Sequence, residues 1–329
     1  MTYNQFTEAE KQLLIVMGHF KGTFPDEKKL LKFGEENIGE YLVRWDDAYT
    51  MLMEKGLLQE KGTGYFLTER GESERMAVEV DNPLWLYEYN MYFTRAETSG
   101  AHKTFCERVY GKNLCQHGIT DMNQLHQLLE VLHLSQSDTV LDLGCGCGLI
   151  TEWLSDATGA SFTGIDLSGE AIKQAKKRER KDLHFQVGNM NHLEFDEDSF
   201  DAIISIDTLY FVDLNDIVSQ LKEIVNPHGQ MGIFFTQWID DDTERELLLP
   251  ACTELAAPLN NNHIQYTTRD FTREEEEHWH KKVEVLEELK PLFEKEGNLQ
   301  LFEYRYDEAV YYKEWDPEKR SRFLYHITM

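Results

Sequence analysis

The spacing of apolar and polar residues changes in character after about residue 136. Beyond this point short apolar runs alternate with segments of helical periodicity. The runs predicted to be strands lie near 138–143, 161–166, 183–187, 200–206 and 230–236. Strands that alternate with helices build a parallel sheet with helices on both faces, so a doubly wound α/β domain is expected over residues 136–329.

Two parts of this region depart from the simple alternation. The stretch 240–296 is long and helical and contains the acidic run Glu274 to Glu277. We interpret residues from about 240 to 272 as a cap inserted after the fifth strand. Strand-like segments near 299–305 and 322–328 are expected to complete a mostly parallel sheet of seven strands.

The first 80 residues predict a small separate domain. Thr7 and Glu10 form a capping-box pattern in front of a helix over 7–20, and two further helices are expected over 26–33 and 39–55. Two short apolar strands around a glycine turn follow within 56–71. Three helices followed by a hairpin resemble a winged-helix domain. Residues 81–135, rich in aromatic side chains, are expected to form a helical linker and lid.

Composition narrows the classes of partner. The chain of 329 residues carries a formal charge of −27, and residues 1–80 hold 10 Lys or Arg against 15 Asp or Glu. A surface so negative repels a phosphate backbone, so no nucleic acid partner is expected and the winged-helix-like domain is assigned to dimerisation or substrate enclosure. A homodimer is the assembly considered.

Location and metal content follow from what the sequence lacks. No basic segment precedes an apolar one at the start and no apolar run is long enough to span a bilayer, so a cytoplasmic protein without membrane contact is expected. The five cysteines include no CxxC pair, and no metal site is expected.

A glycine-rich turn at 140–148 predicts a cofactor site. Asp142 ends a strand, and Gly144, Gly146 and Gly148 follow at alternate positions, which lets the backbone turn tightly against a ligand. A dinucleotide fingerprint would require glycine at 149, where this chain has Leu149. A nucleotide-like cofactor of another class is therefore indicated.

Two more segments extend this site. Asp166 ends the second strand 18 residues after Gly148, where a carboxylate can accept hydrogen bonds from both ribose hydroxyls. Helix capping is the alternative role for Asp166. Asn189 and Met190 follow the third strand, and Leu167 and Met190 are either ligand contacts or core residues.

Together with the segment 200–211 and the turn at 227–230, these motifs resemble the class I, Rossmann-like methyltransferases that use S-adenosylmethionine. The resemblance covers about residues 100–240. It implies S-adenosylmethionine as the cofactor and a set of residues that bind it: Tyr110, Gly118, Asp142, Gly144, Cys145, Gly146, Gly148, Asp166, Leu167, Asn189, Met190 and Ile206. It also implies that Tyr110 and the turn from Gln116 to Gly118 close over the cofactor. On the same resemblance, Leu167 and Met190 enclose the adenine ring, and Asn189, where members of the family usually have Asp, accepts from the adenine amino group through its carbonyl. The loop at the end of the segment 200–211 is then expected to line the methyl-transfer site.

The acceptor is less explicit. Tyr89 and Tyr92 are candidate substrate-binding residues, since aromatic faces can hold a cation, and packing within a tyrosine-rich helix is the alternative explanation. His117 is the candidate base, because histidine exchanges protons near neutral pH, and Tyr210 is a second candidate catalytic residue. We expect methyl transfer to nitrogen or oxygen of a small molecule. The alternatives are a methyltransferase acting on RNA or protein, and a non-catalytic regulator that senses the cofactor.

Overall fold

The computed structural model describes residues 5–329. Contacts divide the chain into two compact units, one ending at Tyr92 and the other beginning at Phe93. The division falls inside helix α5 (Trp85–Thr98). The boundaries predicted near residues 80 and 135 remain predictions.

The first unit follows the predicted order of three helices and a hairpin. Its elements are α1 (Glu8–Gly18), α2 (Glu27–Asn37), the short helix η1 (Gly39–Tyr41), α3 (Asp46–Glu54), β1 (Leu58–Lys61), β2 (Gly64–Leu67) and α4 (Glu69–Asp81). The capping box is present, because the Thr7 amide donates to Glu10 Oε2 at 2.8 Å and the Glu10 amide donates to Thr7 Oγ1 at 3.3 Å. The relation of this unit to winged-helix domains stays an interpretation.

The second unit is built on a seven-stranded sheet in the order β5-β4-β3-β6-β7-β9-β8. Its strands are β3 (Thr139–Leu143), β4 (Ser161–Asp166), β5 (Leu183–Val187), β6 (Phe200–Ile206), β7 (Val225–Trp238), β8 (Gln265–Asp270) and β9 (Arg320–Thr328). Strands β3 to β7 are parallel, and β9 runs antiparallel between β7 and β8. The expected seven-stranded, mostly parallel α/β fold is confirmed.

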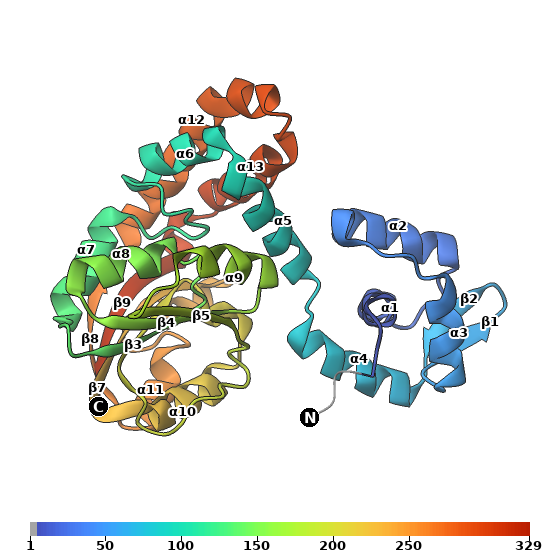
Figure 1. Ribbon diagram of the computed structural model, residues 1–329, viewed down its shortest axis with the longest axis horizontal. Helices are drawn as coiled ribbons and strands as arrows, with labels where there is room; N and C mark the ends of the chain where they lie inside the picture. The colour runs from blue at the N-terminus through green and yellow to red at the C-terminus, as the bar shows by residue number, and fades with distance from the viewer. Residues whose placement is uncertain (1–4) are drawn as a thin grey trace. The chain divides into compact units, whose positions relative to one another are not determined.

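Helices cover both faces of this sheet (Figure 1). On one face α7 (Met122–Leu132), α8 (Leu149–Thr158) and α9 (Gly169–Ala175) pack on a core around Phe162 and Phe234. On the other face α10 (Leu214–Ile224) and α11 (Ala256–Asn261) pack on a core around Ile203 and Ile233. The 3-10 segments are η2 (Lys176–Arg178), η3 (Leu209–Phe211), η4 (Asp242–Leu248) and η5 (Pro317–Lys319).

The strand expected near 299–305 is wrong. That segment begins helix α13 (Leu299–Glu314), and the missing strand is β8. Helix α13 buries Leu301, Arg305 and Ala309, which lie one turn apart on one face. An arginine in the middle of this buried stripe hides its helical period.

Helix α13 packs against α12 (Thr272–Lys295), and α12 also packs against α6 (Gly100–Tyr110). These three helices lie together at the top of the view in Figure 1. Within residues 5–329 no helix is long and apolar enough to cross a bilayer.

Candidate functional site

The glycine loop lies between the carboxyl end of β3 and the start of α8. Gly144, Gly146 and Gly148 all have left-handed φ values, of 74°, 55° and 77°. A Cβ on Gly144 would stand 2.3 Å from Thr208 Cγ2, and one on Gly146 would stand 3.0 Å from the Phe93 ring. The loop therefore requires glycine for both conformation and space.

Two of the predicted cofactor residues lie beneath the loop. The Cys145 side chain is buried, and its sulfur lies against Gly164 of β4. The Asp142 carboxylate is also buried and accepts a hydrogen bond from Thr151 Oγ1 at 2.6 Å. Burial raises the pKa of Asp142 to about 7. In this structure both side chains support the loop, and their role toward a cofactor remains a prediction.

Asp166 joins the loop to the end of β4. Its Oδ2 accepts from the Gly146 amide at 2.9 Å, and its Oδ1 accepts from the Ser168 amide at 2.8 Å. Burial raises its pKa. Each carboxylate oxygen has a second lone pair, and the residue is only partly buried. The carboxylate is thus held rigidly with capacity left to accept hydroxyl groups, which fits the ribose of S-adenosylmethionine.

Helix α9 is capped by Ser168 and not by Asp166. Ser168 is the N-cap of α9, and its hydroxyl accepts from the Ala171 amide at 3.1 Å. The capping role thus belongs to Ser168, and the role of the Asp166 carboxylate toward a cofactor remains a prediction.

The segment after β5 holds the predicted adenine contacts. Asn189 Oδ1 accepts from both the amide and the side-chain nitrogen of Asn191, at 2.9 and 3.0 Å. The carbonyl predicted to accept from adenine is therefore already used twice. Leu167 and Met190 are each partly buried, and Met190 packs on the core beneath the sheet.

Tyr110 and the turn from Gln116 to Gly118 form one hydrogen-bonded group. Tyr110 Oη donates to Gly118 O at 2.8 Å, while Arg305 donates to Tyr110 Oη at 2.9 Å and to His117 O at 2.8 Å. A Cβ on Gly118 would stand 2.4 Å from Asp207 Oδ2. The predicted lid is thus packed against the residue that follows Ile206 at the end of β6.

Asp207 is the second fixed point at this edge of the sheet. It has a left-handed φ of 59° and accepts from the Ile119 amide and from Thr120 Oγ1, at 3.2 and 3.1 Å. Arg322 of β9, fully buried, pairs with Asp207 at 2.5 Å and also donates to Thr120 Oγ1 at 2.7 Å. The last strand therefore holds both the lid and the end of β6.

The candidate catalytic residues lie next to these groups. The His117 ring contacts Tyr304 Oη through Nε2 at 2.8 Å, and burial lowers its pKa to about 3. A histidine with so low a pKa is neutral at pH 7 but holds an accepted proton weakly. Tyr210 Oη accepts from the Thr236 amide at 2.7 Å, and burial raises its pKa. Both roles remain predictions.

Tyr89 and Tyr92 lie on the part of α5 that belongs to the first unit. Tyr89 contacts the Trp85 ring edge to face, with centroids 5.4 Å apart. Their predicted contact with substrate is untested.

Sequence reasoning missed a charged group between α12 and α13, which we name the Lys282 cluster and which consists of Lys282, Arg305 and Glu308. The side chains of Lys282 and Arg305 have no exposed surface. Their nitrogens lie 3.6 and 3.1 Å from Glu308 Oε2. Lys282 follows Trp279 and precedes Leu286 on the buried face of α12, at helical spacing. That position in an apolar stripe was the available signal.

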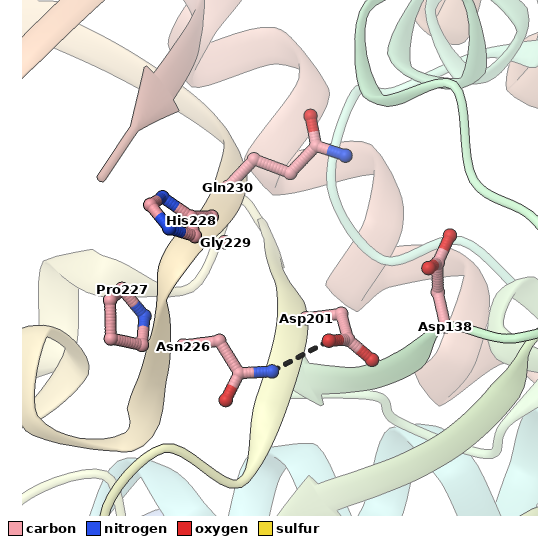
Figure 2. A pocket seen from close by; sticks show the side chains of 7 residues that line it. All are labelled: Asp138, Asp201, Asn226, Pro227, His228, Gly229 and Gln230. Atoms are coloured by element: carbon pink, nitrogen blue, oxygen red, sulfur yellow. Dashed lines mark hydrogen bonds between the residues drawn. The ribbon is translucent and has the colours of Figure 1, made fainter.

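A pocket of about 490 Å³ lies at the amino ends of β3 and β6, at the end of the sheet away from the glycine loop. Figure 2 shows the side chains that line it. It is lined by Asp138, Asp201, Asn226, Pro227, His228, Gly229 and Gln230. Asn226 Nδ2 donates to Asp201 Oδ1 at 2.6 Å. Ligands of parallel α/β sheets bind beyond the carboxyl ends of the strands, whereas Asp138 and Asp201 lie at their amino ends. We therefore place the functional site at the glycine loop.

Residues 140–229 match the family model described as "Methyltransferase domain". Methyltransferase GfsG of Streptomyces halstedii is 31% identical over 113 residues, which are 32% of this chain and 41% of that protein. A sterol 24-C-methyltransferase of Gibberella zeae is 28% identical over 42% of this chain and 37% of its own length. This chain thus spans about two fifths of each of these relatives.

Among solved structures, phosphoethanolamine N-methyltransferase 2 of Haemonchus contortus superposes with a TM-score of 0.58 at 16% identity. The match covers 73% of this chain and 59% of that one. It shows a common fold. No group of three or more His, Cys, Asp or Glu residues suited to a metal is present within residues 5–329. By its sheet order, its glycine loop and the methyltransferase domain matched at 140–229, the second unit has the fold of the class I S-adenosylmethionine-dependent methyltransferases.

Proposed function

We propose that this protein transfers the methyl group of S-adenosylmethionine to a nitrogen or oxygen atom of a small-molecule acceptor. The observation that carries the proposal is the carboxylate of Asp166, which two backbone amides hold beside a loop that only glycine can form. S-adenosylmethionine supplies a sulfonium methyl group, which is transferred in line to a nucleophile. The protein's part is then to position two ligands and exclude water.

In this proposal, Asp166 binds the ribose and the backbone of Gly144 to Gly148 approaches the cofactor closely. Tyr110 and the Gln116 to Gly118 turn cover its methionine part. The lid is tested with Gly118→Ala. The new Cβ would stand 2.4 Å from Asp207 Oδ2, so Asp207 must move. We expect weaker binding of S-adenosylhomocysteine in calorimetry. The control is Gly297→Ala, which strains an exposed turn, where φ is 68°, but meets no neighbouring atom, so the affinity is expected to stay unchanged.

The proposed activity is tested by a tritiated-methyl transfer screen with S-adenosylmethionine over amines, phenols, carboxylates, RNA and basic peptides. We expect label in a small molecule. Label found only in RNA or only in a peptide contradicts the proposed acceptor class. Tight S-adenosylhomocysteine binding with no transfer to any acceptor would instead favour a cofactor-sensing protein.

A further inference from the structure

The Lys282 cluster holds more positive than negative charge in a buried place. Within residues 5–329, neither Lys282 Nζ nor Glu308 Oε2 makes a hydrogen bond, and the 3.6 Å between these two atoms is too long for one. Arg305 is committed through its Nη atoms to His117 O and Tyr110 Oη. With Lys282 protonated, two cations share one carboxylate. Burial of unpaired charge is costly, so such an arrangement favours an anionic ligand.

A row of aromatic rings leads from this cluster to the end of β6. Lys282 Nζ lies 4.0 Å from the centroid of the Trp279 ring, which stacks on Tyr312 with centroids 4.6 Å apart. The ring centroid of Trp238 lies 5.9 Å from that of Tyr312 and 5.1 Å from that of Tyr210. Tyr210 belongs to η3, three residues after Asp207. An apolar body lying along these rings would have one end near the predicted methyl-transfer position and the other near Lys282.

The same geometry disfavours an amine as the group bound at this end. The ammonium of Lys282 already occupies the face of Trp279, where a ligand cation would bind. Glu308 faces both Lys282 and Arg305, so its charge is compensated. A second cation would meet a net positive surrounding.

We propose that Lys282, with Arg305 and Glu308 beside it, binds a carboxylate or phosphate group of the methyl acceptor. The inference rests on the proposed function, because it assumes a methyl acceptor. Lys282 is the residue that donates to the anion, Arg305 ties the cluster to the lid, and Glu308 limits the affinity. The acceptor class becomes small molecules with an apolar or aromatic body and one anionic end.

The test uses the full chain saturated with S-adenosylhomocysteine and four probes that share a phenyl ring: 3-phenylpropanoate, phenyl phosphate, 3-phenylpropanamide and 3-phenylpropylamine. Calorimetry at pH 6.5 is expected to show at least about tenfold tighter binding of one or both anions than of the amide, as for one charge-assisted contact. Which anion binds more tightly distinguishes a carboxylate from a phosphate site. The amine is expected to bind most weakly.

Three variants assign the effect to the cluster. Lys282→Met removes the charge at similar length and is expected to make the anion and amide affinities equal, whereas Lys282→Arg retains the preference. Glu308→Gln is expected to strengthen anion binding, which a merely damaged fold would not do. Thermal midpoints identify any variant that fails to fold, in which case the other two decide.

Several results would overturn the inference. They are equal or tighter binding of the amide or the amine by the natural chain, no anion binding, and an unchanged anion preference in Lys282→Met. A parallel loss of S-adenosylhomocysteine affinity in Lys282→Met would also overturn it, because the bound anion would then be the carboxylate of the cofactor. Failure of the natural chain to bind S-adenosylhomocysteine at all would instead remove the proposed function itself.

Discussion

The glycine loop and the Lys282 cluster belong to the same unit but are built in opposite ways. The shape of the loop depends on its backbone, because Gly144 and Gly146 have left-handed φ values and the Gly146 amide donates a hydrogen bond to Asp166. The cluster uses long side chains from α12 and α13, with hardly any backbone in the contacts between them.

This difference explains why the two regions carry information differently. A loop shaped by glycine leaves a compact motif in the sequence, and every member of a cofactor class needs the same shape. A cluster of side chains can change one residue at a time without altering the helices. Under the proposed function, the backbone of the glycine loop binds the cofactor, and side chains of α12 and α13 bind the acceptor.

The largest expected effect comes from breaking the buried ion pair between Arg322 and Asp207. Arg322→Met leaves Asp207 buried without its partner, so the free energy of unfolding should fall by about 3–5 kcal/mol in urea denaturation. Arg245→Met is the matched control, because its partners Asp242 and Glu318 are exposed, and should change stability by less than about 1 kcal/mol. Equal effects of the two variants would show that burial does not strengthen the Arg322–Asp207 pair.

A slightly smaller effect is expected at the cofactor edge. Asp166→Ala removes a carboxylate that would accept from two ribose hydroxyls, at about 1.5 kcal/mol or more for each, so S-adenosylhomocysteine affinity should fall about a hundredfold. Asp201→Ala changes a carboxylate at the opposite edge, in the pocket of Figure 2, and should leave that affinity unchanged. A weaker effect of Asp166→Ala than of Asp201→Ala would move the cofactor to the other edge.

The charged cluster should reveal itself in the pH dependence of stability. Burial lowers the pKa of Lys282 from 10.5 to about 7, so between these pH values the unfolded chain binds more protons than the folded one. Stability should therefore rise with pH across that interval, by at most about 1.4 kcal/mol per unit, and this contribution should be absent from Lys282→Met. The titratable and charged groups around Lys282 are Glu308, Arg305, Asp207, Tyr110, Cys106, His102, His117 and His278.

Urea denaturation of both chains from pH 6.5 to 10 provides the measurement. Parallel stability curves for the natural chain and Lys282→Met would show that Lys282 keeps an ordinary pKa. The cluster would then be more hydrated than its burial indicates.

The smallest effect is expected where the glycine loop meets a side chain. Thr208 Oγ1 donates to Leu143 O at 3.0 Å and contacts Ser205 Oγ at 2.7 Å. Thr208→Val keeps the methyl group beside Gly144 but loses these bonds, so thermal denaturation should show a loss of about 1 kcal/mol. Thr104→Val, on an exposed part of α6, should change stability by less than about 0.5 kcal/mol. An unchanged Thr208→Val would mean that water replaces the lost partner.

The parallel strands could be predicted because short apolar runs alternate with helical segments, and the loop could be predicted because its glycines are local signals. Strand β8 could not, because it is an edge strand of mostly polar residues, Gln265 to Asp270, with no fully buried position. Helix α13 was missed because the charged residue Arg305 interrupts the apolar stripe that the helix buries.

In the candidate cofactor site, only the residues of the sequence motif could be predicted to lie together. Asp166 and the glycines lie together as expected, whereas the partner of Asn189, its neighbour Asn191, could not be inferred from spacing. The Lys282 cluster depends on α12 meeting α13 and on Arg305 reaching the lid. Such contacts between distant segments leave only the weak trace of a lysine at a core position.

The position of β9 has a consequence for the order in which the protein can fold during synthesis. This strand lies between β7 and β8 but follows both in the chain, and it carries Arg322. Until residues 320–328 have left the ribosome, β7 and β8 lack their common neighbour and Asp207 lacks its cation. The nascent second unit therefore keeps an open sheet edge at β7 until β9 is added.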